Sequence, residues 1–171
     1  MKLESTVLRV SAHRQLHPLL LTALVALLGV GRVAAAADPQ AMFDSRCALC
    51  HQKGGVGVRG QFPRLAGRLG AIAATPGGRA YLQQVVLFGM AGRIEVDGQS
   101  LVGVMPSFAQ FSDDDLAALL NYVTSLGSGP NSGKGGAPFT AAELAQTRGS
   151  AAMNPNQVNA SRSRIISLKG H

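Results

Sequence analysis

The stretch Cys47-Ala48-Leu49-Cys50-His51 (CALCH) contains the only two cysteines of the 171-residue chain and one of its four histidines. Two thiols and an imidazole this close together have three known uses: a zinc site, a redox dithiol or disulfide, and covalent attachment of haem. The pattern C-x-x-C-H favours haem, because the two thiols form thioethers and the adjacent histidine binds the iron. We therefore predict one covalent haem c with iron, held by Cys47, Cys50 and His51.

The two other uses have less support in the sequence. A structural zinc site needs four ligands, and after residue 37 only His171 is left outside CALCH to complete one. A dithiol protein of the thioredoxin type should alternate strands and helices, and this sequence shows no such alternation. Both alternatives stay open at this point.

The first 37 residues have the layout of an export signal. Basic residues begin the chain, the apolar run LLLTALVALLGV (19–30) follows, and the small residues VAAAAD come after Arg32. An uncleaved anchor is the alternative, but it needs roughly 20 apolar residues, and Arg32 interrupts the run too early. We predict a cleaved signal peptide over 1–37, with the cut after Ala36 or Ala37, and therefore a periplasmic protein.

The charge balance is basic but gives no indication of nucleic-acid binding. The chain has 16 Lys and Arg against 9 Asp and Glu, a formal +7, and loss of residues 1–37 leaves +4. No basic block with interleaved aromatics is present, so we expect no nucleic-acid partner, and no membrane span after residue 37. Four basic residues near the motif either attract an acidic redox partner or are ordinary solvated charges: Arg46, Lys53, Arg59 and Arg64.

Helix caps and apolar spacing predict the elements around the motif. Asp38 and Pro39 are suited to begin a helix that runs into CALCH. Apolar residues three and four apart predict a second helix over 79–91, with Met90 on its apolar face. Ser112, followed by three acids, caps a third helix that Gly127 ends.

The remaining segments suggest one haem domain with an extension. Asp97-Gly98 between alternating residues predicts a small β-hairpin near 93–102. Residues 127–138 are rich in Gly, Pro and Ser, and a Thr140–Glu143 capping box predicts a short helix beyond them. We therefore expect a haem domain over 38–126, followed by a linker and C-terminal extension over 127–171.

An electron carrier needs a second axial ligand, and methionine is the usual one in such proteins. The candidates after residue 37 are Met42, Met90, Met105 and Met153, with His171 as an outside candidate. Met105 is favoured, because Pro106 follows it and presents its sulfur from an irregular backbone. Pro63 lies in a loop from which its carbonyl could accept a hydrogen bond from the other ring nitrogen of the histidine.

Three segments together resemble class I c-type cytochromes, specifically bacterial monohaem ones. They are F-x-x-x-CALCH (43–51), FPRLAGR (62–68) and GVMPSFAQFSDDDLAALLNYV (103–123). The resemblance implies an all-α cytochrome c fold of three to five helices around one haem, with Phe43 near Tyr122 where two helices cross. It also implies that the Pro63 carbonyl meets His51 and that Met105 is the distal ligand. Residues 81–108 also look like the cytochrome subunits or partners of periplasmic dehydrogenases.

The function we expect is periplasmic electron transfer by a His/Met-ligated haem, with no catalysis of its own. The donor would be a periplasmic dehydrogenase and the acceptor an oxidase or another cytochrome. Two alternatives keep the haem but change the role. One is a five-coordinate haem sensor or peroxidase-like enzyme, and the other is a cytochrome subunit bound tightly within a dehydrogenase complex.

Overall fold

The computed structural model describes residues 37–127 and 136–167. The predicted signal peptide lies outside these residues except for Ala37, as does most of the linker. The described elements, in chain order, are α2 (Pro39–Arg46), α3 (Ala48–His51), a 3-10 turn η1 (Lys53–Gly55), α4 (Leu69–Ala73), α5 (Gly78–Phe88), β1 (Met90–Val96), β2 (Gln99–Met105), α6 (Asp113–Ser125), α7 (Ala141–Gly149) and α8 (Pro155–Ser167).

The predicted starts of the first and third helices are confirmed. The Asp38 side chain accepts a hydrogen bond from the backbone N–H of Gln40, and Pro39 occupies the first helical position of α2. The Ser112 hydroxyl accepts from the Asp115 N–H at 3.1 Å at the start of α6. Both caps satisfy backbone donors that the first turn of a helix leaves free.

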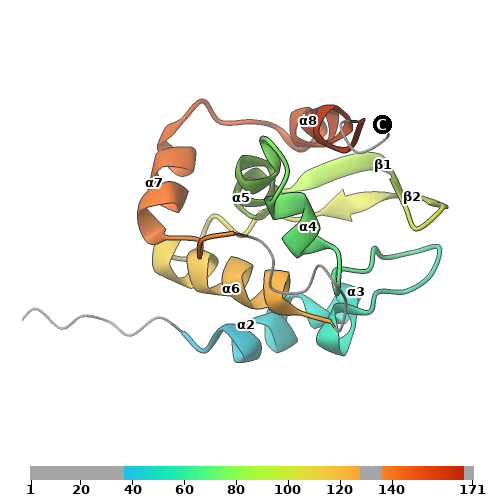
Figure 1. Ribbon diagram of the computed structural model, residues 1–171, viewed down its shortest axis with the longest axis horizontal. Coiled ribbons are helices and arrows are strands. Elements are labelled where there is room, and N and C mark those ends of the chain that lie inside the picture. The colour runs from blue at the N-terminus through green and yellow to red at the C-terminus, as the bar shows by residue number, and fades with distance from the viewer. Residues whose placement is uncertain (1–36, 128–135, 168–171) are drawn as a thin grey trace, which may run out of the picture. The chain divides into compact units, whose positions relative to one another are not determined.

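Helices α2 and α6 pack against each other, at the bottom of the view in Figure 1. The rings of Phe43 and Tyr122 lie 5.6 Å apart at this contact, as the resemblance implied. Phe43 is fully buried. This contact fixes the helix that ends at CALCH against the rest of the core.

The hairpin is longer than predicted. It runs from Met90 to Met105, with Asp97 and Gly98 as its two-residue turn at φ 51° and 71°. The prediction that Met90 lies on a helix is wrong, because α5 ends at Phe88 and Met90 is the first residue of β1. The chain turns at Gly89, where φ is 74°, a conformation that costs glycine little.

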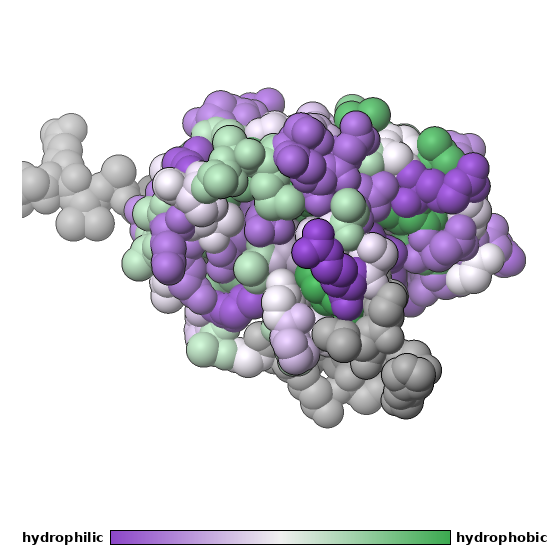
Figure 2. All heavy atoms as spheres, turned by 90° about the horizontal axis from the view of Figure 1, so that it is seen from above, coloured by the Kyte–Doolittle hydropathy of each residue, from purple (hydrophilic) through white to green (hydrophobic). Residues whose placement is uncertain are grey.

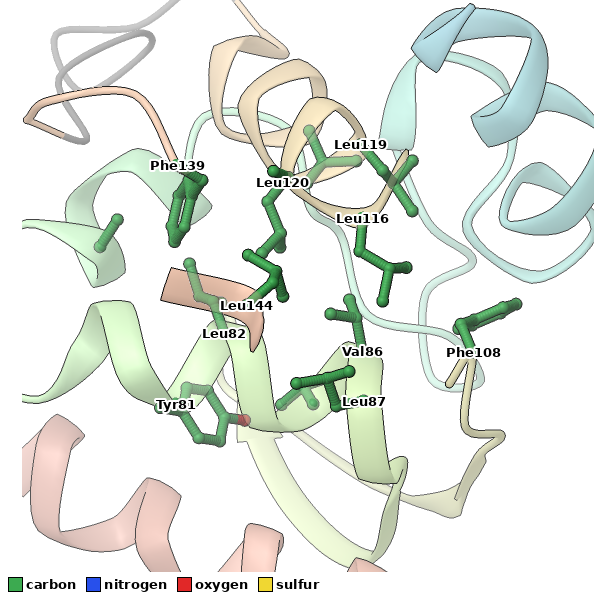
Figure 3. Close-up of a cluster of buried hydrophobic side chains, with 14 of the residues drawn as sticks. Tyr81, Leu82, Val86, Leu87, Phe108, Leu116, Leu119, Leu120, Phe139 and Leu144 are labelled. Carbon is green, nitrogen blue, oxygen red and sulfur yellow. The ribbon is translucent and has the colours of Figure 1, made fainter. Parts of the chain in front are cut away.

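The main core lies between α5 and α6. Figure 3 shows Leu116 and Leu120 of α6 facing Leu82 and Val86 of α5. Leu144 of α7 is fully buried in the same cluster. Apolar side chains from three helices thus form one continuous interior.

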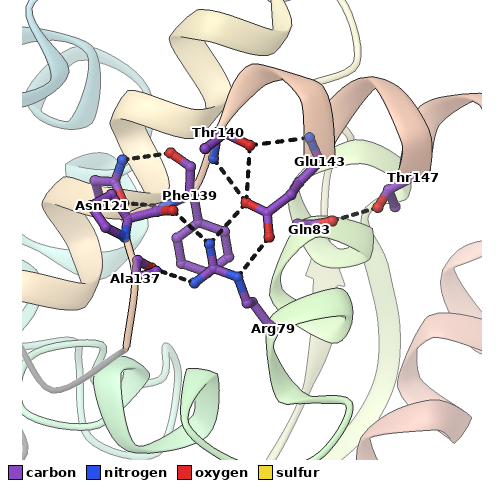
Figure 4. A network of polar contacts seen from close by, with 9 residues as sticks. Arg79, Gln83, Asn121, Ala137, Phe139, Thr140, Glu143 and Thr147 are labelled. Atoms are coloured by element: carbon purple, nitrogen blue, oxygen red, sulfur yellow. Dashed lines mark hydrogen bonds and ion pairs between the residues drawn. The ribbon is translucent and has the colours of Figure 1, made fainter.

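Helix α7 is held to the core by a polar network (Figure 4). The Arg79 guanidinium donates two hydrogen bonds of 2.8 Å to the two carboxylate oxygens of Glu143, and others to the carbonyls of Ala137 and Pro138. Its charged carbon also lies 4.0 Å from the centre of the Phe139 ring. The predicted capping box of α7 is confirmed.

Helix α8 lies over β1 and α5. Asn159 donates to the carbonyls of Ala91 (2.9 Å) and Arg93 (3.1 Å), so the helix is fastened along the strand. Figure 2 looks onto this side of the molecule, and the surface there is mainly hydrophilic. Two apolar residues of α8 are buried against the molecule: Val158, which is fully buried, and Ile165.

The expected three to five helices are too few for the described residues, which contain seven α-helices. The first predicted helix bends at Cys47 into α2 and α3, and α7 and α8 come from the extension. The broader expectation of a helical protein with one small antiparallel hairpin is confirmed.

Candidate functional site

The CALCH segment forms one short turn of helix. The N–H of His51 donates to the Cys47 carbonyl at 2.9 Å, and that of Cys47 to the Phe43 carbonyl at 2.8 Å. Cys47, Cys50 and His51 stand at i, i+3 and i+4 and so share one side of the turn. Leu49, on the other side, is 84% exposed. Both thiols and the imidazole therefore point toward the protein interior.

Cys47 and Cys50 are half-buried, and no disulfide joins them. Burial, with a smaller contribution from Cys50, raises the pKa of Cys47 to about 11. Among the described residues, no three His, Cys, Asp or Glu side chains gather as a metal site. His171, which the zinc alternative requires, lies outside the described residues.

His51 is oriented by the Pro63 carbonyl. Its Nδ1 lies 2.9 Å from the Pro63 oxygen, and because a carbonyl only accepts, Nδ1 carries the proton. This contact confirms the predicted meeting of the two groups. Burial lowers the pKa of His51, while the hydrogen bond opposes that shift. The imidazole is thus neutral at pH 7, with the lone pair of Nε2 free to bind a metal.

The Pro63 carbonyl is held by close backbone packing at Gly57. The Gly57 N–H donates to the His51 carbonyl at 2.8 Å. A Cβ at this position would lie 2.7 Å from the Phe62 oxygen and 2.8 Å from the Pro63 carbonyl carbon, and φ is +72°. Only a glycine lets the two stretches of backbone approach this closely.

Two adjoining cavities, of about 370 and 100 Å³, open beside this turn. Cys47, His51, Pro63 and Met105 line both, and Cys50 lines the larger. The larger has the volume typical of cofactor sites, roughly 300–1,000 Å³. The walls of the smaller cavity are mainly apolar and come largely from α5 and α6: Leu82, Val85, Val86, Leu119, Leu120 and Val123.

Met105 ends β2 and is half-buried against the core. The next residues are fastened to the end of α5: the Ser107 hydroxyl donates to the Leu87 carbonyl at 2.5 Å, and the Phe108 N–H to the Val86 carbonyl at 2.8 Å. Gly89 lets this loop approach, since a Cβ there would lie 2.6 Å from the Met105 oxygen. Met105 therefore lines the cavity from a fixed backbone.

Met90 also lines both cavities. Its sulfur accepts a hydrogen bond of 3.2 Å from the Tyr81 hydroxyl. Sequence reasoning placed Met90 on a helix and so missed that it is the strand partner of Met105. Gly89, as a helix-ending residue, was the sequence feature that could have shown it.

The four basic residues of the predicted patch do not form one group. Arg46 lines the larger cavity, with its charged carbon 5.6 Å from the centre of the Phe111 ring. Arg64 pairs with Asp97 at 3.0 Å beside Arg59, at a separate cavity. Lys53 is exposed on η1 and lines none of these cavities.

Two residues that the sequence analysis did not name, Arg68 and Arg162, also line the smaller cavity. Arg162 lies on α8, in a C-terminal segment whose sequence is mainly polar. Val158 and Ile165, seven residues apart, are both buried. That spacing was the sequence feature that could have revealed an inward-facing side of this helix.

The residues at the site fit haem c. Two thiols stand one helical turn apart at the wall of an apolar cavity, beside an imidazole whose free nitrogen suits iron. A thioether lines the same cavities from the hairpin. The fold and site thus define a helical protein suited to hold a single c-type haem.

Comparison with known proteins gives the family. A sequence profile of the family described as cytochrome c oxidase, cbb3-type, subunit III matches residues 34–123. One cytochrome c-552 of Thermus thermophilus is 42% identical over 142 residues, 83% of this chain and 95% of that protein. A second cytochrome c-552 of the same species is 44% identical over 121 residues, 71% of this chain and 92% of that protein. The chain belongs to the c-type cytochromes and is a monohaem member.

Membership of the c-type cytochromes identifies the cofactor and the general role of the protein. The protein carries haem c with its iron, and it is an electron carrier rather than an enzyme. None of the helices in the described residues is long and apolar enough to cross a membrane. The narrower likeness to cytochromes of periplasmic dehydrogenases stays a prediction.

Proposed function

We propose that this cytochrome is a periplasmic electron carrier whose iron is bound by His51 on one side and Met105 on the other. The observation that carries the proposal is that both side chains line the same two cavities as the thiol of Cys47. Haem c supplies a one-electron Fe(III)/Fe(II) couple. The chain supplies fixed ligands and a mainly apolar surrounding for it.

The residues around the two ligands favour a rigid site. The Pro63 carbonyl holds His51 in one tautomer, and the loop after Met105 is fastened to α5. A thioether ligand and apolar walls both favour the reduced state. A site with two protein ligands also leaves no position for a substrate, which agrees with a carrier.

The export proposal rests on the sequence of residues 1–37 and on the family. Haem c is attached outside the cytoplasm, which is where an export signal would deliver the chain. We propose that the signal is removed by a cut after Ala36 or Ala37 and that 38–126 form the haem domain, with 127–171 as an extension of it. The contacts of α7 and α8 with α5 and β1 support an extension that packs on the haem domain.

Redox partners would meet the protein at the rim of the larger cavity. Phe62, Val102 and Val104 line this cavity and are 38%, 66% and 75% exposed. Exposed apolar side chains around a cofactor edge are typical of an interaction site. A dehydrogenase as donor remains our proposal, and the oxidase-subunit family profile supports an oxidase as acceptor.

The test is the visible and near-infrared spectrum of the exported protein, oxidised and then reduced. The proposal expects a low-spin c-type spectrum with the ferric charge-transfer band that marks a methionine–iron bond. A high-spin spectrum, with carbon monoxide binding to the reduced protein, would instead support the sensor or peroxidase-like alternative. Co-purification with a dehydrogenase would support the tightly bound subunit.

A further inference from the structure

The wall of the smaller cavity is mainly apolar but includes a buried charged side chain, that of Arg162. Arg162, from α8, is only 9% exposed and lines this cavity together with Arg68 and Tyr81. A buried guanidinium keeps its charge at every physiological pH. It therefore requires partners that compensate for the loss of water.

The protein supplies only part of that compensation. One nitrogen of Arg162 donates to the Glu95 carbonyl at 2.8 Å. The guanidinium also lies beside the Tyr81 hydroxyl, where it opposes the rise in the pKa of Tyr81 that burial causes. In the described part of the chain, Arg162 forms no ion pair with a carboxylate. Its five N–H donors thus have a carbonyl and a hydroxyl as partners, but no anion.

The neighbouring charges increase the excess of positive charge. Arg68 lines the same cavity, and burial lowers its pKa. Asp97 opposes this shift, and the nearby Arg162 and Arg64 add smaller lowering contributions. Asp97 is shared, at 3.0 Å from Arg64 and 3.6 Å from Arg68. One carboxylate therefore serves two arginines, and neither Asp97 nor the exposed Glu95 forms an ion pair with Arg162.

Haem c contains the missing anions. It carries two propionate carboxylates on the edge of the ring opposite the two thioether positions. Cys47 lines both cavities and Cys50 only the larger, whereas Arg68 and Arg162 line the smaller of the two. We propose that Arg162, with Arg68 beside it, binds a haem propionate, so that α8 of the C-terminal extension forms part of the haem site. This inference rests on the proposed function.

The backbone around Arg162 supports a fixed position for it. Asn159, one turn earlier on α8, is bonded to the carbonyls of Ala91 and Arg93. Arg162 itself is bonded to the Glu95 carbonyl on the same strand. A guanidinium held in this way can offer two N–H groups to a carboxylate with little further loss of side-chain entropy. Charge-assisted hydrogen bonds between arginine and a carboxylate are also stronger than neutral ones.

The first experiment measures the propionates in the unaltered holoprotein. Carbon-13 NMR of the propionate carboxyl carbons, followed against pH, should show one that titrates roughly 1–3 units below the ordinary carboxyl value of about 4.3. The groups facing Arg162 that enter this titration are Arg68, Tyr81, Arg93 and Glu95. Two propionates that both titrate near the ordinary value would overturn the proposal.

The second experiment assigns the effect to Arg162. Arg162→Gln should raise the low propionate pKa toward the ordinary value and lower the midpoint potential, because a cation beside the haem favours the reduced state. Arg162→Lys should restore part of both shifts. The control Arg164→Gln removes the same charge from an exposed position on the same helix and should change neither. Equal effects of Arg162→Gln and Arg164→Gln would contradict the proposal.

These outcomes are separate from those that test the ligands. If the unaltered protein lacks the methionine–iron band but has one low propionate pKa, the proposed His51 and Met105 ligation is wrong and the Arg162 proposal stands. If the band is present and both propionates titrate near the ordinary value, the Arg162 proposal is wrong and the proposed His51 and Met105 ligation stands.

Discussion

Met90 and Met105 are directly opposite each other in the hairpin, at its open end. Opposite residues of an antiparallel pair point to the same side of the sheet, so both sulfurs are close to the same cavities. The difference between them is in their partners. Tyr81 donates a hydrogen bond to the sulfur of Met90, whereas no hydrogen bond to the sulfur of Met105 is seen within the described residues. This difference supports our proposal that Met105, rather than Met90, binds the iron.

The two methionines give the first prediction. Met105→Ala should abolish the methionine–iron charge-transfer band and lower the midpoint potential by on the order of 100 mV, because the thioether ligand favours Fe(II). Met90→Ala should keep the band. Absorption spectra and redox titrations of the two variants check this.

A third variant removes an ambiguity in that comparison. If Met90 replaced the lost ligand in Met105→Ala, the band would persist, and the double variant Met90→Ala/Met105→Ala would then lose it. Such a result would show that the cross-strand neighbour can take over as ligand. Loss of the band in Met90→Ala alone would contradict our assignment.

The second prediction concerns the support of His51. Gly57→Ala should lower the free energy of unfolding by about 2–4 kcal/mol, since the added methyl group meets the backbone at Phe62 and Pro63 and the residue is held at positive φ. The clash should also weaken the hydrogen bond from His51 to the Pro63 carbonyl. Chemical denaturation of the holoprotein measures the first effect, and the NMR shift of the His51 Nδ1 proton measures the second.

Gly60 offers a matched control. It has φ +76° but nothing within 4 Å of an added Cβ, so Gly60→Ala carries the backbone strain without the clash. It should lose about 1 kcal/mol and leave the His51 proton unchanged. Identical behaviour of the two variants would show that close packing at Gly57 has no special role.

The third prediction uses the Arg79–Glu143 pair. The hydrogen bond from Arg79 is the largest cause that lowers the pKa of Glu143, to about 2. Ionised Glu143 therefore stabilises the fold above the unfolded-state pKa near 4.5, and this contribution is lost as pH falls toward 2. Because the pair is partly exposed, we expect Glu143→Gln to cost only about 1–2 kcal/mol at pH 7, and much less near pH 2.

Glutamine can keep the capping box at Thr140, so this variant isolates the charge. Circular dichroism during denaturant unfolding, at pH 7 and near pH 2, gives the difference from the unaltered protein. Asp44→Asn, at an exposed position on α2, is the control and should be neutral at both pH values. A cost that is the same at both pH values would mean that the charge of Glu143 does not contribute.

The fourth prediction concerns the start of the mature chain. The backbone nitrogen of Ala37 lies 2.8 Å from a carboxylate oxygen of Asp115. Cleavage after Ala36 would turn this amide into an ammonium group and the hydrogen bond into an ion pair. We therefore expect the intact mass of the exported holoprotein to begin at Ala37. A mass that begins at Asp38, or one that retains the whole N-terminus, would contradict this.

Local signals in the sequence were sufficient for much of the haem domain. Caps at Asp38 and Ser112 and the turn at Asp97 act within a few residues, so their effect can be read directly from the sequence. The position of Met90 could not be read in this way. Its apolar spacing fits a helix, and its pairing depends on Met105, a residue fifteen positions further along the chain.

The polar contacts that fasten the C-terminal extension were not predictable, for a different reason. Helix α8 has few apolar residues, and polar groups such as Asn159 hold it by bonding to backbone carbonyls. Every residue has a backbone carbonyl, so the sequence does not show which carbonyls accept these hydrogen bonds. The roles of Cys47, Cys50 and His51 were proposed from five residues, whereas the burial of Arg162 required the fold.

The place of Arg162 in the chain has a consequence for how the protein matures. Arg162 comes 111 residues after His51, so a chain exported from its N-terminus presents CALCH long before α8. Until α8 arrives, β1 and Tyr81 lack their cover, and the pocket is open on that side. On the proposed export route, Cys47, Cys50 and His51 would therefore be accessible to haem before α8 covers the pocket.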